Sequence, residues 1–135
     1  MSVHVRFRVG SESYAVPVED VLEVAELGDL APVPGAPAAV LGVRNLRGQV
    51  LPVVDLATVF GVERHVGPTR LVITESRGRR AGLAINEVTD VGELLGAMHE
   101  SESGFLSGAA LADGDLVGVV DLERVFAAVE REVAR

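Results

Sequence analysis

Residues 34–56 read PGAPAAVLGVRNLRGQVLPVVDL, and no other stretch of the chain says more about its fold. It contains two apolar runs, Leu41–Leu46 and Gln49–Asp55, which are typical of strands because Val and Leu dominate them. Arg47 and Gly48 separate the runs by two residues, a common length for a tight turn between antiparallel strands. We therefore expect a β-hairpin that turns at Gly48.

The four residues that close this hairpin, Val-Val-Asp-Leu at 53–56, occur again at 119–122, which is 66 positions later. In both copies the Asp follows an apolar run and precedes a segment that is expected to be helical. Asp55 and Asp121 are therefore expected to cap short helices by accepting hydrogen bonds from free backbone N–H groups. Acid–base catalysis by paired carboxylates is the alternative, but equivalent positions in two copies favour the structural role.

A second match, at a shift of 67, extends this repeat. It places four residues on counterparts of the same type, namely Val21, Val24, Glu26 and Leu27 on Val88, Val91, Glu93 and Leu94. The opening strand then falls on residues 70–76. Because both matches occur in the same order, chance similarity between Val-rich segments does not explain them. We predict one mainly β domain over residues 1–135, a pair of small barrels with repeat halves at about 1–66 and 67–135.

Polar residues in two segments are expected to face solvent. From Val3 to Val9 the chain alternates apolar and polar residues. This period of two predicts a half-buried strand with His4 and Arg6 on its solvent face. The basic cluster of the sequence consists of Arg77, Arg79 and Arg80. Its position on a hairpin turn predicts a solvated tip, and a site for phosphate or for an acidic partner is the alternative.

Composition excludes several classes of protein. The 135 residues include no Cys and all twelve basic residues are Arg, which excludes thiol chemistry, disulfides and catalytic lysines. The net charge of −8 argues against binding to nucleic acid. His4, His65 and His99 lie far apart in the sequence and have no carboxylate or second His at metal-binding spacing. We expect no catalytic residue, no metal site and no cofactor, and therefore no enzyme.

Apolar residues make up 48% of the chain and aromatic residues only 4%. Such a chain, rich in Val, Ala and Leu, indicates β-structure with some exposed apolar surface. The longest apolar stretch, residues 31–43, contains three prolines and two glycines and is too short to cross a bilayer. The N-terminus lacks the apolar core of a signal peptide. We expect a cytoplasmic protein with no direct membrane insertion.

Residues 34–56 resemble the most characteristic stretch of the CheW family of chemotaxis coupling proteins. Residues 82–88 (GLAINEV) and the step Phe105–Gly108 fit the same family, so the resemblance runs from Val5 to Val129. It implies two intertwined five-stranded SH3-like β-barrels with short helices and a C-terminal helix, and strands exchanged between the halves would fit it. It also implies a non-enzymatic adaptor that links the cytoplasmic tip of a methyl-accepting chemoreceptor to the regulatory domain of a CheA-type histidine kinase. These partners recruit such adaptors to membrane receptor arrays.

The resemblance places the receptor-facing surface on two segments, at Val21, Glu23 and Val24 and at Asn45, Leu46 and Arg47. In this interpretation Val21, Val24 and Leu46 supply apolar burial against the receptor helix. Glu23 and Arg47 set the register through charge pairs, which favour specificity more than affinity.

Two features depart from the family pattern. Asn86 stands where the family commonly has Asp, and the connection Leu94–Phe105 is short and lacks the usual prolines. In the family this connection helps to make the second kinase contact, which closes rings in receptor arrays. The nearest alternative function is the same adaptor in another receptor–kinase pathway, such as surface motility, biofilm formation or gene regulation. A barrel that binds a peptide or small molecule is a further alternative, and it needs a concave polar pocket between the barrels.

Overall fold

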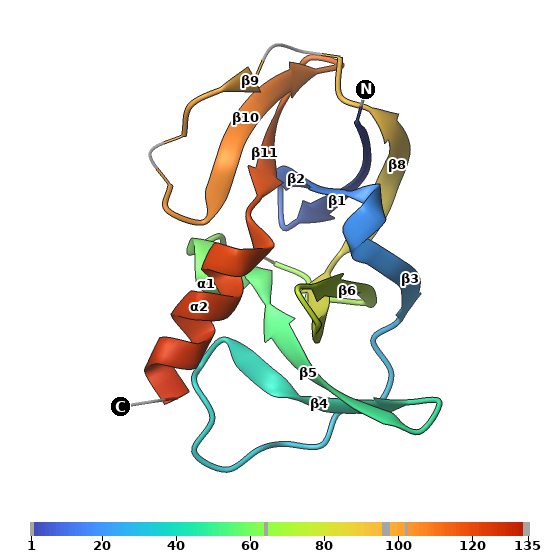
Figure 1. The fold of residues 1–135 in the computed structure, drawn as a ribbon, viewed down its shortest axis with the longest axis vertical. Coiled ribbons are helices and arrows are strands. Elements are labelled where there is room, and N and C mark those ends of the chain that lie inside the picture. Colours follow the sequence, from blue (N-terminus) through green and yellow to red (C-terminus); the bar gives the residue numbers. More distant parts are fainter. Residues whose placement is uncertain (1, 64, 96–97, 102, 134–135) are drawn as a thin grey trace.

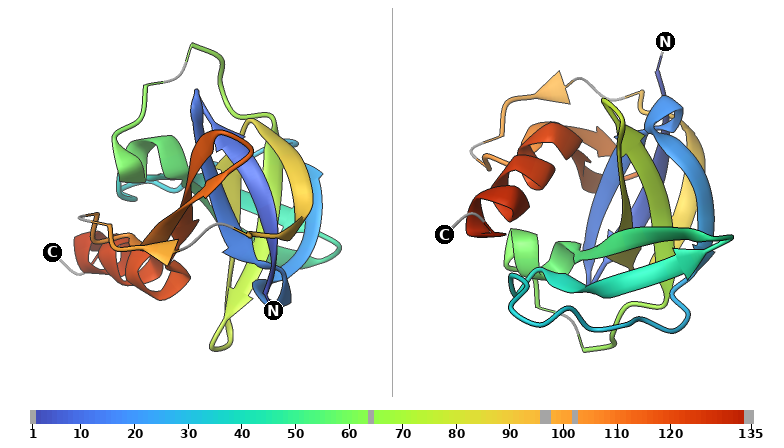
Figure 2. Two further views of the ribbon diagram at one scale, coloured as in Figure 1. Left: turned by 90° about the horizontal axis from the view of Figure 1, so that it is seen from above. Right: turned by 60° about the horizontal axis from the view of Figure 1, so that its bottom comes forward.

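Two curved β-sheets and two α-helices make up the part of the chain that the structure, a computed structural model, describes: residues 2–63, 65–95, 98–101 and 103–133 (Figure 1, Figure 2). Sheet A has the spatial order β8 (Glu87–Glu93), β1 (Val3–Val9), β2 (Glu12–Pro17), β11 (Asp115–Val120), β10 (Leu106–Ala112) and β9 (Met98–His99). Sheet B has the order β3 (Val21–Glu26), β6 (Arg70–Ser76), β7 (Arg79–Ile85), β5 (Gln49–Asp55) and β4 (Val40–Leu46). The helices are α1 (Leu56–Phe60) and α2 (Leu122–Val133), and a 3-10 turn, Val18–Asp20, leads into β3.

The two sheets exchange strands along the chain. The early strands β1 and β2 lie in sheet A beside the late strands β8 to β11, and β6 and β7 lie in sheet B between β3 and β5. Each sheet contains one parallel pair, β2 with β11 in sheet A and β5 with β7 in sheet B. The prediction of a mainly β fold with two similar units and short helices is confirmed. The boundaries of the repeat halves, 1–66 and 67–135, stay a prediction.

Three hairpins turn through the same backbone geometry. In each hairpin both turn residues have positive φ: Arg47 and Gly48 after β4, Arg77 and Gly78 after β6, and Asp113 and Gly114 after β10. A two-residue turn of this kind matches the right-handed twist of the strands that it joins. The turn predicted at Gly48, which has a φ of 82°, is therefore one of three turns with the same conformation.

The main apolar core lies between the sheets and is covered on one side by α1 and α2 (Figure 1). Aromatic rings extend it, because Tyr14 stacks on Phe60 with ring centroids 4.5 Å apart and Phe60 meets Phe105 edge-on at 6.0 Å. Burial raises the pKa of Tyr14 to about 12. A second, smaller cluster fills sheet B and consists of Leu51, Val53, Leu71, Ile73 and Ala84.

The expectation of a half-buried first strand is wrong. Val5, Phe7 and Val9 face the core between the sheets, as the alternation predicts. The opposite face is buried too, since only 7% of His4 and 9% of Arg6 is exposed. Sheet A curls, and the buried residues Val117 and Val119 of β11 and Ala110 of β10 lie on the same face as Arg6. His4 and Arg6 are therefore enclosed rather than solvated.

Within the described residues, neither helix is long and apolar enough to cross a membrane. The connection Leu94–Phe105 is described only in part, because residues 96, 97 and 102 lie outside the described ranges. Its described portion includes β9, whose two residues pair with Ala109 and Ala110 of β10.

Candidate functional site

Sheet B brings together the two segments that are expected to face the receptor. Glu23 lies on β3 and Arg47 lies in the turn that follows β4, and β3 and β4 are the two edge strands of sheet B. Arg47 donates from Nη1 to Glu23 Oε2 at 2.5 Å and from Nη2 to Glu23 Oε1 at 2.6 Å. This bidentate ion pair joins the edges and leaves 67% of the Arg47 side chain exposed. The two charges therefore hold each other, which the sequence did not indicate.

The apolar residues of this surface differ in exposure. Val24 is exposed, whereas Val21 is half-buried against the core between the sheets and Leu46 is half-buried against the cluster inside sheet B. Val50, which sequence reasoning missed, is more exposed than Val24 and lies opposite Asn45 in the β4–β5 ladder. The signal in the sequence was the period of two, which puts Val50 on the face opposite to Leu51 and Val53.

Hydrogen bonds fix the hairpin that carries Arg47. The side chain of Asn45 accepts a hydrogen bond from the backbone N–H of Gly48 at 3.1 Å, which closes the turn. On the same strand, Arg44 donates from Nε to the carbonyl of Leu27 at 3.0 Å. Beside this guanidinium the chain turns at Gly28, whose φ of 63° lies in the left-handed region that favours glycine. Gly28 therefore lets the connection between β3 and β4 approach the site.

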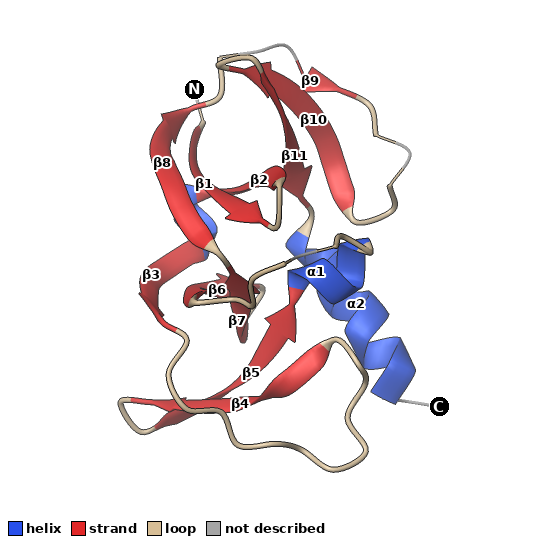
Figure 3. Cartoon of the chain, turned by 180° about the vertical axis from the view of Figure 1, so that it is seen from behind, coloured by secondary structure: helices blue, strands red, loops and turns tan. Residues whose placement is uncertain are grey.

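The same connection runs along β4 (Figure 3). Ala31 and Val43 exchange two backbone hydrogen bonds, of 2.9 and 2.8 Å, so the loop adds a short bridge to this sheet edge. Gly42 permits the approach, because its φ is 150° and an added Cβ would lie 2.5 Å from the carbonyl oxygen of Ala31. Strand β4, which leads to Asn45 and Arg47, is thus hydrogen-bonded to β5 on one side and to the loop at Ala31 on the other.

A family model described as "CheW-like domain" matches residues 4–130. The chain belongs to this family. The chemotaxis protein CheW of Rhizobium meliloti (strain 1021) is 32% identical over 144 residues, which cover 96% of this chain and 90% of that protein. Protein FrzA of Myxococcus xanthus is 42% identical over 84 residues, 61% of this chain and 52% of that protein. The crystal structure of the scaffolding protein TtCheW from Thermoanaerobacter tengcongensis matches with a TM-score of 0.82 at 27% identity, over 90% of this chain and 84% of that one.

These relatives and the shared fold identify this CheW-like domain as a non-enzymatic adaptor of chemotaxis-like signalling. Among its described residues, no group of three His, Asp or Glu side chains is arranged to hold a metal ion.

The two repeated acids lie at the starts of the two helices. Asp55, with 1% of its surface exposed, accepts hydrogen bonds from the backbone N–H of Ala57 at 3.3 Å and from the hydroxyl of Thr58 at 2.9 Å. Asp121 accepts from the backbone N–H of Arg124 at 3.2 Å. Each carboxylate is thus used by the helix that follows it.

Arg77 and Arg80 are exposed, as expected for a solvated basic tip, whereas the expectation is wrong for Arg79, which is half-buried. Arg79 binds two acids of α2, Glu123 at 2.7 Å and Glu130 at 2.5 Å, and its guanidinium lies 5.7 Å from the ring centre of Phe126. A hydrogen bond donated by the Ser76 hydroxyl and a second one donated by Arg79 lower the pKa of Glu123. Arg80 bonds to Glu75 and to Gln49. The cluster fastens α2 and neighbouring strands, which a hairpin pattern alone does not reveal.

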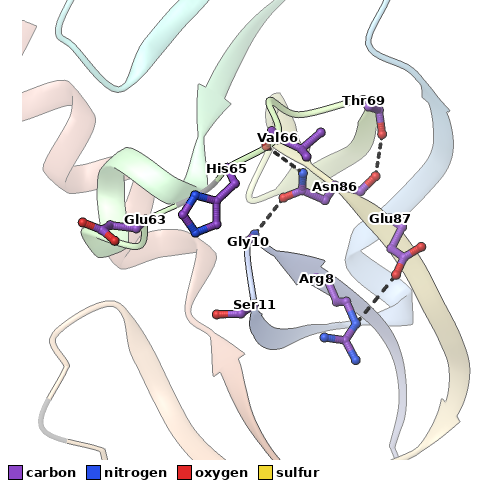
Figure 4. Close-up of a pocket in the computed structure, with 9 residues that line it drawn as sticks. All are labelled: Arg8, Gly10, Ser11, Glu63, His65, Val66, Thr69, Asn86 and Glu87. Carbon is purple, nitrogen blue, oxygen red and sulfur yellow. Dashed lines mark hydrogen bonds and ion pairs between the residues drawn. The ribbon is translucent and has the colours of Figure 1, made fainter.

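The departure at Asn86 has a local explanation (Figure 4). Its side-chain oxygen accepts from the backbone N–H of Gly10 at 2.7 Å, and its amide nitrogen donates to the carbonyls of Val66 and Gly67 at 3.1 and 3.2 Å. An ionised Asp could make only the first bond, because it has no donor. In this CheW-like domain Asn86 therefore links the segment that leads into β6, which includes Val66 and Gly67, to the β1–β2 turn.

These bonds line a hollow of about 550 Å³ between the β1–β2 turn and the approach to β6. Its size is in the range of small-molecule sites. The amide of Asn86 in its wall bonds to three backbone partners, and Arg8 lies 3.7 Å from Glu87. The alternative of a peptide or small-molecule binder requires a hollow of this kind, so the structure does not remove that alternative.

Proposed function

We propose that this CheW-like domain couples the cytoplasmic tip of a methyl-accepting chemoreceptor to the regulatory domain of a CheA-type histidine kinase. Both partners would recruit it to receptor arrays on the cytoplasmic side of the membrane. The receptor-facing surface in this proposal consists of Val21, Glu23, Val24, Asn45, Leu46 and Arg47. The observation that carries the proposal is the bidentate ion pair between Glu23 and Arg47, which unites the two segments on one sheet.

A helical partner can use the two kinds of group on this surface in different ways. Val24 of this surface and Val50, which lies opposite Asn45 in the β4–β5 ladder, have exposed side chains that a helix could cover. Val21 and Leu46 lie deeper and keep the strands in place through their own packing. We expect most of the receptor affinity to come from the exposed pair of valines, because burial of apolar area is the main attractive contribution.

The ion pair changes the role expected for the two charges. Both terminal nitrogens of Arg47 already bind Glu23, so a partner carboxylate would share this guanidinium rather than occupy an empty one. A guanidinium has five N–H donors, which leaves donors for a second acceptor. Arg47 would then recognise an acidic residue of the receptor, and Glu23 would hold Arg47 in the orientation that this contact needs.

Charge reversal and charge exchange test this arrangement. Arg47→Glu is expected to weaken binding of a receptor-tip fragment at least about tenfold while the far-UV circular dichroism stays unchanged. The exchange Glu23→Arg with Arg47→Glu restores the internal pair but reverses its direction, so binding should stay weak. Arg70→Glu is the matched control, since Arg70 is an exposed arginine of the same sheet that lies near Glu26.

The outcomes separate the parts of the proposal. Binding of Arg47→Glu at wild-type strength would contradict a role for this surface. Full recovery in the exchange variant would show that the pair acts only by holding the two segments together, against a direct contact between Arg47 and the receptor.

The kinase part of the proposal needs its own measurement. Titration calorimetry with the regulatory domain of the cognate CheA-type kinase should show a saturable complex with this domain. The absence of association at high micromolar concentration would contradict kinase coupling, whatever the result with the receptor.

The same adaptor in another receptor–kinase pathway is the second candidate function. The match to a relative named FrzA, alongside proteins named CheW, favours keeping it. Titration against the regulatory domains of every CheA-type kinase of the organism would separate the two candidates, because the cognate domain should bind most tightly.

A further inference from the structure

Corresponding residues of the two sheets can be matched one by one through the strand pairing. Arg6 lies opposite Ala15 on one side and Asp90 on the other, and Ile73 lies opposite Gly82 and Glu23. Arg6 and Ile73 are therefore equivalent, as are Asp90 and Glu23. Asp113, with a φ of 51°, and Arg47, with a φ of 49°, are equivalent first residues of the β10–β11 and β4–β5 turns.

The ion pair between Glu23 and Arg47 in sheet B has no counterpart with the same charges in sheet A. Where sheet B has Glu23 and Arg47, sheet A has Asp90 and Asp113, which are both acidic. The positive charge that pairs with these two acids is Arg6, which lies in the interior of sheet A. Its Nη1 lies 3.0 Å from Asp113 Oδ2 and 3.8 Å from Asp90 Oδ2. One guanidinium thus bridges the β10–β11 turn and β8 across the curved sheet.

The residues enclosed by sheet A also differ from those enclosed by sheet B. In sheet B the position of Arg6 holds Ile73, which is 2% exposed and belongs to the inner apolar cluster. Sheet A encloses smaller residues, Ala15, Ala110, Val117 and Val119, none of which belongs to either large cluster. Arg6 fills the remaining space. Its Nε is buried and has no hydrogen-bond partner among the described residues.

A buried guanidinium is costly unless an opposite charge neutralises it. For Arg6 this charge comes mainly from Asp113, whose own side chain is 83% exposed to solvent. Besides this contact, the β10–β11 hairpin is paired to the rest of sheet A through three residues of β11 opposite β2. Its other neighbour, β9, contributes two residues. The β4–β5 hairpin of sheet B pairs with β7 through three residues as well, so the contact of Asp113 with Arg6 is what distinguishes the β10–β11 hairpin.

We propose that Arg6, Asp113 and Asp90 form an ionic clasp that keeps the β10–β11 hairpin closed over sheet A, and that loss of the clasp opens this hairpin while sheet B stays closed. In sheet A the clasp takes the positions that Ile73, Glu23 and Arg47 occupy in sheet B. The inference does not depend on which partner this domain binds, because it concerns contacts within one chain.

Native-state amide exchange measured on the whole chain tests the proposal. Asp113→Asn keeps the shape and the turn preference of the side chain but removes the charge that neutralises Arg6. We expect the amides of β10 and β11 to exchange about tenfold faster or more in this variant, since the enclosed guanidinium of Arg6 loses its nearest negative charge. Amides of the equivalent strands β4 and β5 should change less than about twofold.

Two further variants complete the test. Arg6→Ile with Asp113→Asn gives sheet A the residue that sheet B uses, and exchange of β10 and β11 should return to about the wild-type rate. Asp115→Asn is the control, because it removes an exposed acid of the same hairpin. The proposal is overturned if Asp113→Asn leaves the exchange of β10 and β11 unchanged, if Asp115→Asn accelerates it equally, or if the double variant exchanges as fast as Asp113→Asn.

Discussion

Apart from β9, which only sheet A contains, sheets A and B arrange equivalent strands in the same order and share a turn geometry, yet they fill their interiors in different ways. Sheet B encloses a compact apolar cluster and carries its ion pair, Glu23 with Arg47, on the outside. Sheet A encloses Arg6 and neutralises it with acids at the two positions equivalent to that pair. The backbone thus tolerates either chemistry, provided that every enclosed charge meets an opposite one. The conditions for closing the two sheets are correspondingly different.

Ile73→Arg should have the largest effect, because it puts the guanidinium of sheet A into sheet B without a second acid. An uncompensated buried charge costs about 3–5 kcal/mol, and the free energy of unfolding measured in urea should fall by that amount. Adding Arg47→Asp recreates the two acids of sheet A and should recover about 2 kcal/mol. A double variant no more stable than Ile73→Arg would break the equivalence between the sheets.

The two capping acids offer a comparison at a second pair of equivalent positions. Asp55→Ala should lower the free energy of unfolding by about 2 kcal/mol, because this buried carboxylate accepts two hydrogen bonds. Asp121→Ala should cost about 1 kcal/mol, since its side chain is more exposed. Urea denaturation of both variants measures the difference, and equal losses would show that burial of the cap is irrelevant.

Asn86→Asp tests how the two sheets are joined. The substitution keeps an acceptor for Gly10 but removes the donor to the carbonyls of Val66 and Gly67. We expect a loss of about 1–2 kcal/mol in thermal or urea unfolding, because those carbonyls then face a carboxylate. An unchanged midpoint would mean that the approach to β6 needs no support from this side chain.

The smallest effect on stability is expected for Arg47→Ala. An exposed ion pair contributes about 0.2–1 kcal/mol, so the unfolding midpoint should hardly move. Asp113→Asn, at the equivalent position of sheet A, should destabilise the protein more, since it removes the charge that neutralises the buried Arg6. A loss of several kcal/mol in Arg47→Ala would mean that the two closing contacts are energetically alike.

Much of the fold could be predicted because its signals are local. The turn at Gly48 and the helix starts at Asp55 and Asp121 depend on residues within a few positions of each other. The two shifts of the repeat also paired positions that the structure matches, such as Val24 with Val91. The burial of Arg6 could not be predicted from alternation, since β11, about 110 residues later, covers that face.

The candidate site shows the same division. The resemblance named Glu23 and Arg47 but gave no sign that they bind each other, because that contact depends on the curvature of sheet B. Arg79 was misread for a similar reason, since α2 lies far from it in the sequence. The repeat did hold a signal for the clasp. At its shifts, Arg6 falls on an apolar residue and Asp113 on a basic one, and these mismatches mark where the sheets differ.

The exchange of strands between the sheets has a consequence for the synthesis of this protein. When the ribosome has made β1 and β2, their partners β8 and β11 do not yet exist, so both strands must wait with unpaired edges. Sheet B can close once β7 has emerged, but sheet A needs nearly the whole chain. Long-range pairing of this kind folds slowly and leaves strand edges open to aggregation. A nascent chain stalled after β7 would therefore expose Val5 and Phe7, and chaperone contacts should concentrate there.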